Sequence, residues 1–483
     1  MNELLDTSAT ELSRRIRDRE VSCREVMTAT LDQVARLNPQ FNALVSLQDA
    51  EQSLAQADAA DALLQRGERQ GFMHGFPLAV KDLSPASGFP TTLGSPLFKN
   101  NLARRDALFV ERMKNAGALV IGKSNTPEFG LGSQTYNPLF GTTLNAFDPS
   151  RTAGGSSGGA AVAIALRMLP LADGSDMGGS LRNPAAFNNI YGLRPTYGRV
   201  PSVPTDDSFF QQLGTEGPMG RSPEDVARLL AVQAGRDARA PLSLQGAVPD
   251  ADTLRIDDMP GPLGKGACRI GWLGGIWPDL PLERGIVDLC QQGLKVFADL
   301  GHGVDDARLD FPRERNWLAW TVLRQFITGG KLAGEYADAK RRALLKPEAV
   351  WEIEAFLALS APDVHRATVA RSGLYQAMNR LFETFDVLAV PTAQVFPFDA
   401  ATHWPASIEG VAMDTYHRWM EIVTPMTLCG VPALSVPLGF NEAGLPMGMQ
   451  LVGRPGADFE LLALAHRYHE ATQWPQRRRP AAA

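Results

Sequence analysis

Cysteine and histidine are scarce in this sequence, and the few that occur are scattered. The 483 residues include four cysteines and seven histidines. No CxxC pair occurs among Cys23, Cys268, Cys290 and Cys429, and the histidines form neither an HxH nor an HxxxH pair. This pattern argues against a zinc site and against a disulfide framework. We therefore predict four buried free thiols in a reducing cytoplasm and no metal centre.

The chain also lacks an excess of positive charge and any long apolar run. Its net charge is -6, which disfavours nucleic acid and anionic membranes as partners and favours a small neutral or polar molecule. No segment approaches the roughly 18 apolar residues of a membrane-spanning helix. The first residues, MNELLDTSATELSRRIRDRE, are charged and contain no apolar segment typical of signal peptides. The expected location is the cytoplasm.

Apolar residues are plentiful and follow helical and strand patterns. They make up 44% of the chain, which is enough for a large core. Two S-x-x-E capping boxes, beginning at Ser8 and Ser22, predict helices in the first sixty residues. The next expected elements are a buried strand at 76–80, a helix at 109–116 and a second buried strand at 117–122. Strands that alternate with helices predict a sheet covered on both faces.

Later elements are longer, and one long stretch has few of them. We expect a strand–helix–strand unit over 269–309, helices over 313–380, buried strands at 385–391 and 432–437, and a last helix from a capping Asp458 to Thr472. Residues 141–200 are instead rich in turn residues around an alanine-rich helix at 160–168. Long irregular stretches inside a compact domain usually carry function.

Two short matches to well-known motifs do not fit their mechanisms. Gly117–Ser124 matches the Walker A pattern, but the residues between its glycines are themselves an apolar strand rather than a flexible phosphate loop. Gly154–Gly158 matches G-x-S-x-G, but a nucleophile elbow needs a strand before the serine, and NAFDPSRTA is not one. Nucleotide binding and an α/β-hydrolase site with Ser156 as nucleophile are therefore not favoured.

Three other segments could together cleave an amide, which requires an activated hydroxyl, a base and donors for the oxyanion. Lys81 could be the base if its pKa fell from about 10.4 to near 7, a change of about 4 kcal/mol; alternatively it pairs with Asp82. Gly178-Gly179-Ser180 could turn successive N–H groups toward one point, or form a tight loop with an inert serine. The glycine-rich loop 154–159 allows unusual backbone angles, or is a flexible linker.

These segments resemble the amidase signature family. The resemblance is carried by GGSSGG at 154–159, D-x-GGS-x-R at 176–182 and GLRPTYGRV at 192–200, with Ser156 and Ser180 standing 24 residues apart. It extends to GFPLAVKDL at 75–83, IGKSNTPEFG at 121–130, PALSVPLGF at 432–440 and GLPMGMQLVGRP at 444–455, and so covers nearly the whole chain.

The resemblance implies a Ser-cisSer-Lys triad. Lys81 would be the base, Ser156 the bridging serine after a cis Gly155–Ser156 peptide, and Ser180 the acyl-forming nucleophile. The implied oxyanion hole consists of the backbone N–H groups of Met177, Gly178, Gly179 and Ser180. The residues expected to shape the site are Ser157, Asp176 and Arg182. Neither a metal nor an organic cofactor is expected, and a homodimer is common among relatives.

The implied fold is a single large α/β/α domain around a mixed, twisted central sheet. Its expected segments are an N-terminal helical segment packed on the core (1–70), the signature core with the triad (71–204), a continuation with a variable helical cap over the pocket (205–430), and C-terminal strands and a helix that complete the same domain (431–483).

The sequence leaves the substrate open. Met177 stands where many relatives have a small polar residue such as threonine, and Asn188-Asn189-Ile190 replaces a common Cys-Gly stretch. Six aromatic residues either line the pocket or pack between helices: Trp317, Trp320, Phe326, Trp351, Trp404 and Trp419. If they line it, a small amide with an apolar or aryl substituent fits best. The alternatives are the glutaminase-type A subunit of a tRNA-dependent amidotransferase and an inactive binding relative, and esters or carbamates could share the acyl-enzyme.

Overall fold

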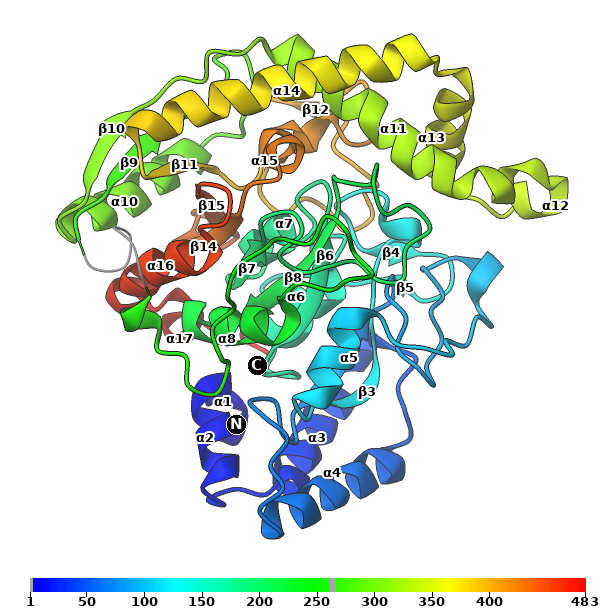
Figure 1. Ribbon diagram of the computed structural model, residues 1–483, viewed down its shortest axis with the longest axis vertical. Coiled ribbons are helices and arrows are strands. Elements are labelled where there is room, and N and C mark those ends of the chain that lie inside the picture. Colours follow the sequence, from blue (N-terminus) through cyan, green and yellow to red (C-terminus); the bar gives the residue numbers. More distant parts are fainter. Residues whose placement is uncertain (1–2, 260–265) are drawn as a thin grey trace.

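A mixed β-sheet forms the centre of the molecule (Figure 1). The computed structural model describes residues 3–259 and 266–483. Within these residues, eight strands lie side by side in the order β10-β9-β11-β15-β14-β7-β8-β6. Strands β9, β10 and β11 run parallel, and the remaining neighbours pair antiparallel. The predicted mixed α/β architecture is confirmed. The strands are β6 (Ala172–Asp176), β7 (Tyr191–Arg194), β8 (Thr215–Gly220), β9 (Arg269–Trp272), β10 (Gly303–Asp306), β11 (Val387–Pro391), β14 (Ala433–Phe440) and β15 (Pro446–Val452).

The middle strands of the sheet are apolar and lie buried beneath helices. All residues of β11 and β15 are buried, and so is β14 apart from its last residue. Continuous apolar strands of this kind are typical of sheets covered on both faces. The covering helices are α7 (Arg182–Phe187), which packs on β14 and β15, α10 (Ile286–Asp299), which packs on the same strands, and α8 (Pro223–Gln233), which packs on β7 and β8.

A smaller three-stranded sheet carries the segment that ends in Lys81. Its strands, in order, are β1 (Leu44–Val45), β3 (Leu119–Ser124) and β2 (Pro77–Lys81). Strand β2 runs parallel to β3 and all five of its residues are buried. The strands predicted at 76–80 and 117–122 are therefore confirmed, and the Walker-like residues 119–124 lie in a strand, not in a phosphate loop.

The first helices form as predicted, but only one has a full capping box. They are α2 (Ala9–Arg17), α3 (Cys23–Phe41) and α4 (Ala50–Gln65). At α3, Ser22 Oγ accepts from the Glu25 N–H and the Glu25 carboxylate accepts from the Ser22 N–H. At α2, Ser8 Oγ accepts from the Glu11 N–H, while the Glu11 carboxylate binds Arg14 instead.

Three long helices form the layer at the top of Figure 1. These are α11 (Arg313–Ala337), α13 (Pro347–Ala358) and α14 (Ala361–Thr384), and α11 packs against both of the others. They confirm the helices predicted over 313–380. Among the helices in the described residues, none has both the length and the apolar composition needed to cross a membrane.

Two predictions made from the sequence were wrong. Residues 141–200 contain strands β6 and β7 as well as the predicted helix, now α6 (Gly158–Ala165). Asp458 begins the last long helix, α16 (Asp458–Thr472), but does not cap it, because its carboxylate accepts from the Thr196 N–H and from the Arg199 guanidinium. All four cysteines are buried and free, as predicted. The expected segments 1–70 and 205–430 include residues 1–2 and 260–265, which lie outside the described residues, and the segment boundaries remain a prediction.

Candidate active site

Lys81 lies at the end of β2 with its amino group among serine hydroxyls. Its side chain is fully buried, and Nζ lies 2.7 Å from Ser156 Oγ, 2.8 Å from Ser157 Oγ and 3.0 Å from Ser175 Oγ. The alternative partner, Asp82, accepts hydrogen bonds from Thr92 and lies near Lys123 instead. Lys81 therefore points into a polar cluster and does not form a strand-end ion pair with its neighbour.

Burial makes the neutral form of Lys81 accessible near neutral pH. Loss of solvent lowers the pKa of Lys81 from 10.5 to about 7, because a charged ammonium is disfavoured away from water. The carboxylates of Asp173, Asp176 and Glu216 act in the opposite direction and keep that pKa from falling further. A lysine with a pKa near 7 can exchange protons at the pH at which most enzymes work.

The glycine-rich loop 154–159 is a packed element and not a flexible linker. The Gly155–Ser156 peptide is cis, as expected. Ser133 Oγ donates to the Gly155 carbonyl at 2.5 Å, and the next glycines begin helix α6. A Cβ placed on Gly159 would lie 2.4 Å from the backbone of Ala43 and Asn125, so only glycine fits there. The loop holds the Ser156 hydroxyl against Lys81.

The segment that carries Ser180 is organised by a buried carboxylate. Asp176 accepts from the N–H groups of Gly179 and Leu181 at 3.0 and 3.1 Å, and its two oxygens accept from Arg182 at 2.8 and 2.9 Å. Burial alone would raise the pKa of Asp176, but Arg182 and Arg194 hold that pKa well below its usual range. Asp176 and Arg182 therefore shape the loop and bind each other.

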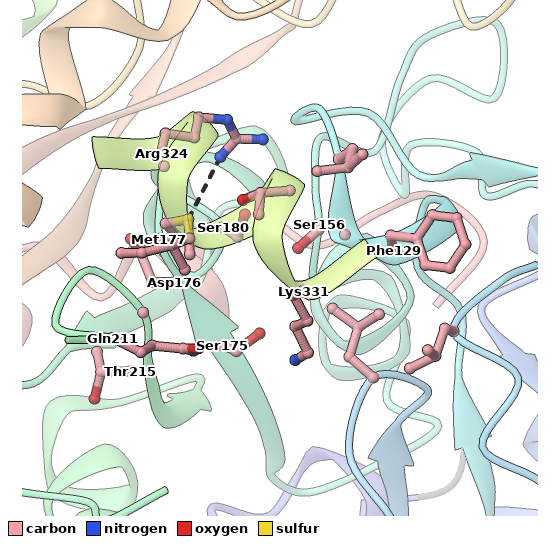
Figure 2. A pocket seen from close by; sticks show the side chains of 18 of the residues that line it. Phe129, Ser156, Ser175, Asp176, Met177, Ser180, Gln211, Thr215, Arg324 and Lys331 are labelled. Atoms are coloured by element: carbon pink, nitrogen blue, oxygen red, sulfur yellow. Dashed lines mark hydrogen bonds between the residues drawn. The ribbon is translucent and has the colours of Figure 1, made fainter. Parts of the chain in front are cut away.

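Ser156 and Ser180 line one cavity of about 200 Å³ (Figure 2). Ser180 is 7% exposed, and its carbonyl accepts from the Ser157 N–H at 3.2 Å, which joins its segment to the glycine-rich loop. Asp176, Met177 and Gly178 line the same cavity. The apolar part of the wall consists of Leu83, Leu93, Phe129, Leu131, Met177, Ile327, Leu332 and Met420.

The six aromatic residues singled out in the sequence do not line this cavity, so the alternative in which they form its wall is wrong. Trp320 and Trp419 are almost fully buried. The Trp320 ring packs behind Gly178, where an added Cβ would lie 3.2 Å from the ring. Phe326 lines a neighbouring cavity of about 1060 Å³, which shares Leu83, Ile327 and Lys331 with the first. The Trp320 ring supports the site from behind.

One face of α11 forms the roof of the cavity. A helical cap over the pocket was expected within 205–430, but the residues that face the cavity were not predicted from the sequence. The roof residues are Arg324, Ile327, Thr328, Lys331 and Leu332, which follow the i, i+3, i+4, i+7, i+8 spacing of one helical face. Glu216 on β8 and Ser175 on β6 also line the cavity and were not predicted. The helical spacing was a readable signal, but its mixture of charged and apolar residues is also typical of a helix surface facing solvent.

Comparison with known proteins decides the family. The amidase family model matches residues 25–462 of the chain. The chain belongs to the amidase signature family. The chain is 32% identical to the A subunit of a glutamyl-tRNA(Gln) amidotransferase from Trichormus variabilis over 494 residues, covering 97% of this chain and 98% of that protein.

Solved amidase signature structures share the whole fold. A bacterial aryl acylamidase superposes with a TM-score of 0.89 at 29% identity, over 97% of both chains. The A subunit of the glutamyl-tRNA(Gln) amidotransferase of Thermotoga maritima superposes with a TM-score of 0.75 at 26% identity, over 97% of this chain and 95% of that one. Amidase signature enzymes act on carbon–nitrogen amide bonds, and this chain is such an enzyme.

Proposed function

We propose that this amidase hydrolyses a small carboxylic amide through an acyl-enzyme on Ser180. The observation that carries the proposal is the 2.7 Å contact between Lys81 Nζ and Ser156 Oγ beside a cavity that Ser180 also lines. Neutral Lys81 accepts a proton from Ser156, which accepts one from Ser180 as Ser180 Oγ attacks the amide carbonyl. The N–H groups of Met177, Gly178 and Ser180 stabilise the oxyanion, whereas the N–H of Gly179, also expected in the oxyanion hole, already donates to Asp176 at 3.0 Å.

The same relay then runs in reverse. Protonated Lys81 returns its proton through Ser156 to the leaving amine, and the carbon–nitrogen bond breaks to leave an ester on Ser180. Water replaces the amine, gives up a proton to the relay and attacks the ester, which releases the carboxylic acid and restores Ser180. Esters and carbamates that fit the cavity would share the acyl-enzyme step.

The cavity favours a compact and largely apolar substrate. Its volume of about 200 Å³ is smaller than the roughly 300–1,000 Å³ of sites for drug-sized ligands. Two thioethers, Met177 and Met420, and several aliphatic side chains form its wall. Of its lining carboxylates, Asp176 is already neutralised by two arginines. An alkyl or aryl amide therefore suits the apolar part of the wall, beside which Glu216 and Lys331 also line the cavity.

A second candidate is a glutaminase-type A subunit of a tRNA-dependent amidotransferase. The curated relative with that name supports it, since 32% identity extends over 97% of this chain. The sequence comparison thus favours this candidate, whereas the wall of the cavity and the aryl acylamidase fold match support the first. In this second role the chain would pass ammonia to a partner protein.

Hydrolysis by the purified chain alone separates the two candidates. We expect release of the amine from a small aryl anilide and from short aliphatic amides, with little ammonia from glutamine, and no turnover by Ser180→Ala. Hydrolysis of glutamine without hydrolysis of the anilides would favour the second candidate. Wild-type turnover that Ser180→Ala retains would contradict both.

A further inference from the structure

Arg324 is a buried cation in the roof of the cavity that the proposed reaction does not use. Its side chain is 5% exposed and belongs to the cavity-lining face of α11. Figure 2 shows its guanidinium next to Met177, on the side of the cavity where Asp176 and Ser180 also lie. The N–H donors of a buried arginine need hydrogen-bond partners, either in the protein or on a bound substrate.

Two of its three nitrogens have strong partners that fix it in place. Nε donates to Glu352 Oε1 at 2.6 Å, and Nη2 donates to Tyr416 Oη at 2.6 Å. Tyr416 Oη in turn donates to the same Glu352 oxygen at 2.5 Å. The guanidinium also lies over the rings of Trp320 and Tyr416. Its charge is therefore balanced by Glu352 and its orientation is set before any substrate binds.

The third nitrogen, Nη1, has only a weak partner. It donates to Met177 Sδ at 3.5 Å, and a thioether sulfur is a poor acceptor compared with a carbonyl or ether oxygen. Met177 lines the cavity, and so does Arg324. An oxygen atom on a bound substrate could replace the sulfur and gain a charge-assisted hydrogen bond, which is stronger than one between neutral groups.

We propose that Arg324 Nη1 is a specificity-determining donor that binds a neutral oxygen acceptor, such as a ketone, ether or second amide carbonyl, on the substrate of this amidase. This inference rests on the proposed function and names the class of amide the cavity selects. A neutral acceptor suits this donor because Glu352 already neutralises the guanidinium, so a carboxylate would gain little from its charge. The preferred substrate thus carries one further oxygen acceptor besides its reacting amide.

Matched amides test this inference. The two amides of a pair have the same length, and one carries an oxygen acceptor where the other carries a methylene. In one series this position lies in the acyl part of the amide, and in the other series it lies in the amine part. We expect kcat/KM to favour the oxygen member by about tenfold or more in one of the series, since a site built around a donor discriminates against a ligand that lacks the acceptor.

The variant Arg324→Lys removes the donor while keeping a positive charge opposite Glu352. Its preference for oxygen should fall to about twofold or less, because kcat/KM should fall more for the oxygen member than for the methylene member. Arg313→Lys is the matched control, because Arg313 also lies on α11 and binds Glu421 through two nitrogens at 3.0 and 2.8 Å, yet does not line the cavity. It should leave the preference unchanged.

Calorimetry with Ser180→Ala measures the Kd of both members of each pair without turnover, so their affinities can be compared directly. A wild-type chain that hydrolyses no amide would refute the proposed function, while the ratio of Kd values would still decide the role of Arg324. The inference is overturned if neither series shows a preference in the chain with Arg324 intact, or if the preference persists in Arg324→Lys. Should that variant not fold, the preference of the intact chain alone decides.

Discussion

Activity should fall about fivefold from pH 7 to pH 6 and about tenfold for each further pH unit, because the proposed relay needs Lys81 in its neutral form. Burial lowers the pKa of Lys81 to about 7. About half of the molecules would then hold neutral Lys81 at pH 7, about one tenth at pH 6 and about nine tenths at pH 8. Values of kcat/KM for a slow anilide, measured from pH 5 to pH 9, should rise along this curve and level off above pH 8.

The lowered pKa of Lys81 also determines how the free energy of unfolding changes with pH. Because the unfolded chain has a lysine pKa near 10.5, holding Lys81 near 7 costs roughly 4–5 kcal/mol of folding free energy at pH 7. Between these two values the unfolded state binds a proton that the folded state lacks, so stability rises with pH in that window. Lys81→Met should be inactive yet more stable than wild type at pH 7, and urea denaturation should show this gain shrinking toward pH 10.

Two variants distinguish the titration of Lys81 from the titration of nearby ionisable groups. Burial lowers the pKa of Lys123 to about 8, and its amino group lies near Ser84 and Asp82 but contacts none of the serines around Lys81. In Lys123→Met, activity should therefore fall at the same acidic pH as in wild type. Asp173→Asn removes a carboxylate that raises the Lys81 pKa, so that fall should move to lower pH. A flat profile from pH 5.5 to 8.5, or a shift upward in Asp173→Asn, would refute the reasoning.

Three further substitutions test the parts of the site, and a fourth is a control on α11. Ser180→Ala should lower kcat at least about 10³-fold while the far-UV spectrum stays unchanged, since only the nucleophile is lost; residual turnover near wild type would contradict the assignment. Arg182→Met leaves its buried carboxylate partner without its closest counter-charge, and thermal unfolding should show a loss of about 3–5 kcal/mol. Gly174→Ala would place a Cβ 2.7 Å from Ser157 Oγ, next to Lys81, so kcat should fall about tenfold. The control Gly334→Ala would place its Cβ in open space on α11, so it should raise the free energy of unfolding by about 0.5–1 kcal/mol and leave kcat unchanged.

Local signals predicted much of the fold, whereas the grouping of Lys81, Ser156 and Ser180 into one site was implied by the resemblance to the amidase signature family. Buried strands such as 77–81 stand out because their apolar runs are continuous, and the glycine-rich loop stands out by composition. Strand β6 escaped notice because its residues, ADGSD, are mostly polar or glycine, and its pairing with β8 comes from a strand about forty residues later. Such a strand is stabilised by tertiary contacts that no local pattern encodes.

A helical cap over the pocket was expected, but the residues of the cap that face the cavity were not predictable, for a related reason. The tryptophans of the 313–420 region are large and apolar, which suits a substrate wall and a helix interface equally well. Only the rotation of α11 decides that Trp320 packs behind Gly178 while Arg324 faces the cavity. Likewise the Asp458 carboxylate, which local sequence suggests as a helix cap, binds Arg199 from a distant segment.

The position of β14 and β15 bears on how the protein is made. These strands lie between β11 and β7 in the sheet, although residues 433–452 are synthesised after both of those strands. Until they leave the ribosome, the growing chain holds two half-sheets whose facing edges await partners, and Arg182 lacks Gln450, whose Oε1 accepts from it at 2.6 Å. Unpaired apolar edges of this kind promote aggregation. The nascent enzyme should therefore acquire activity only after residues 433–452 have emerged and rely on chaperones until then.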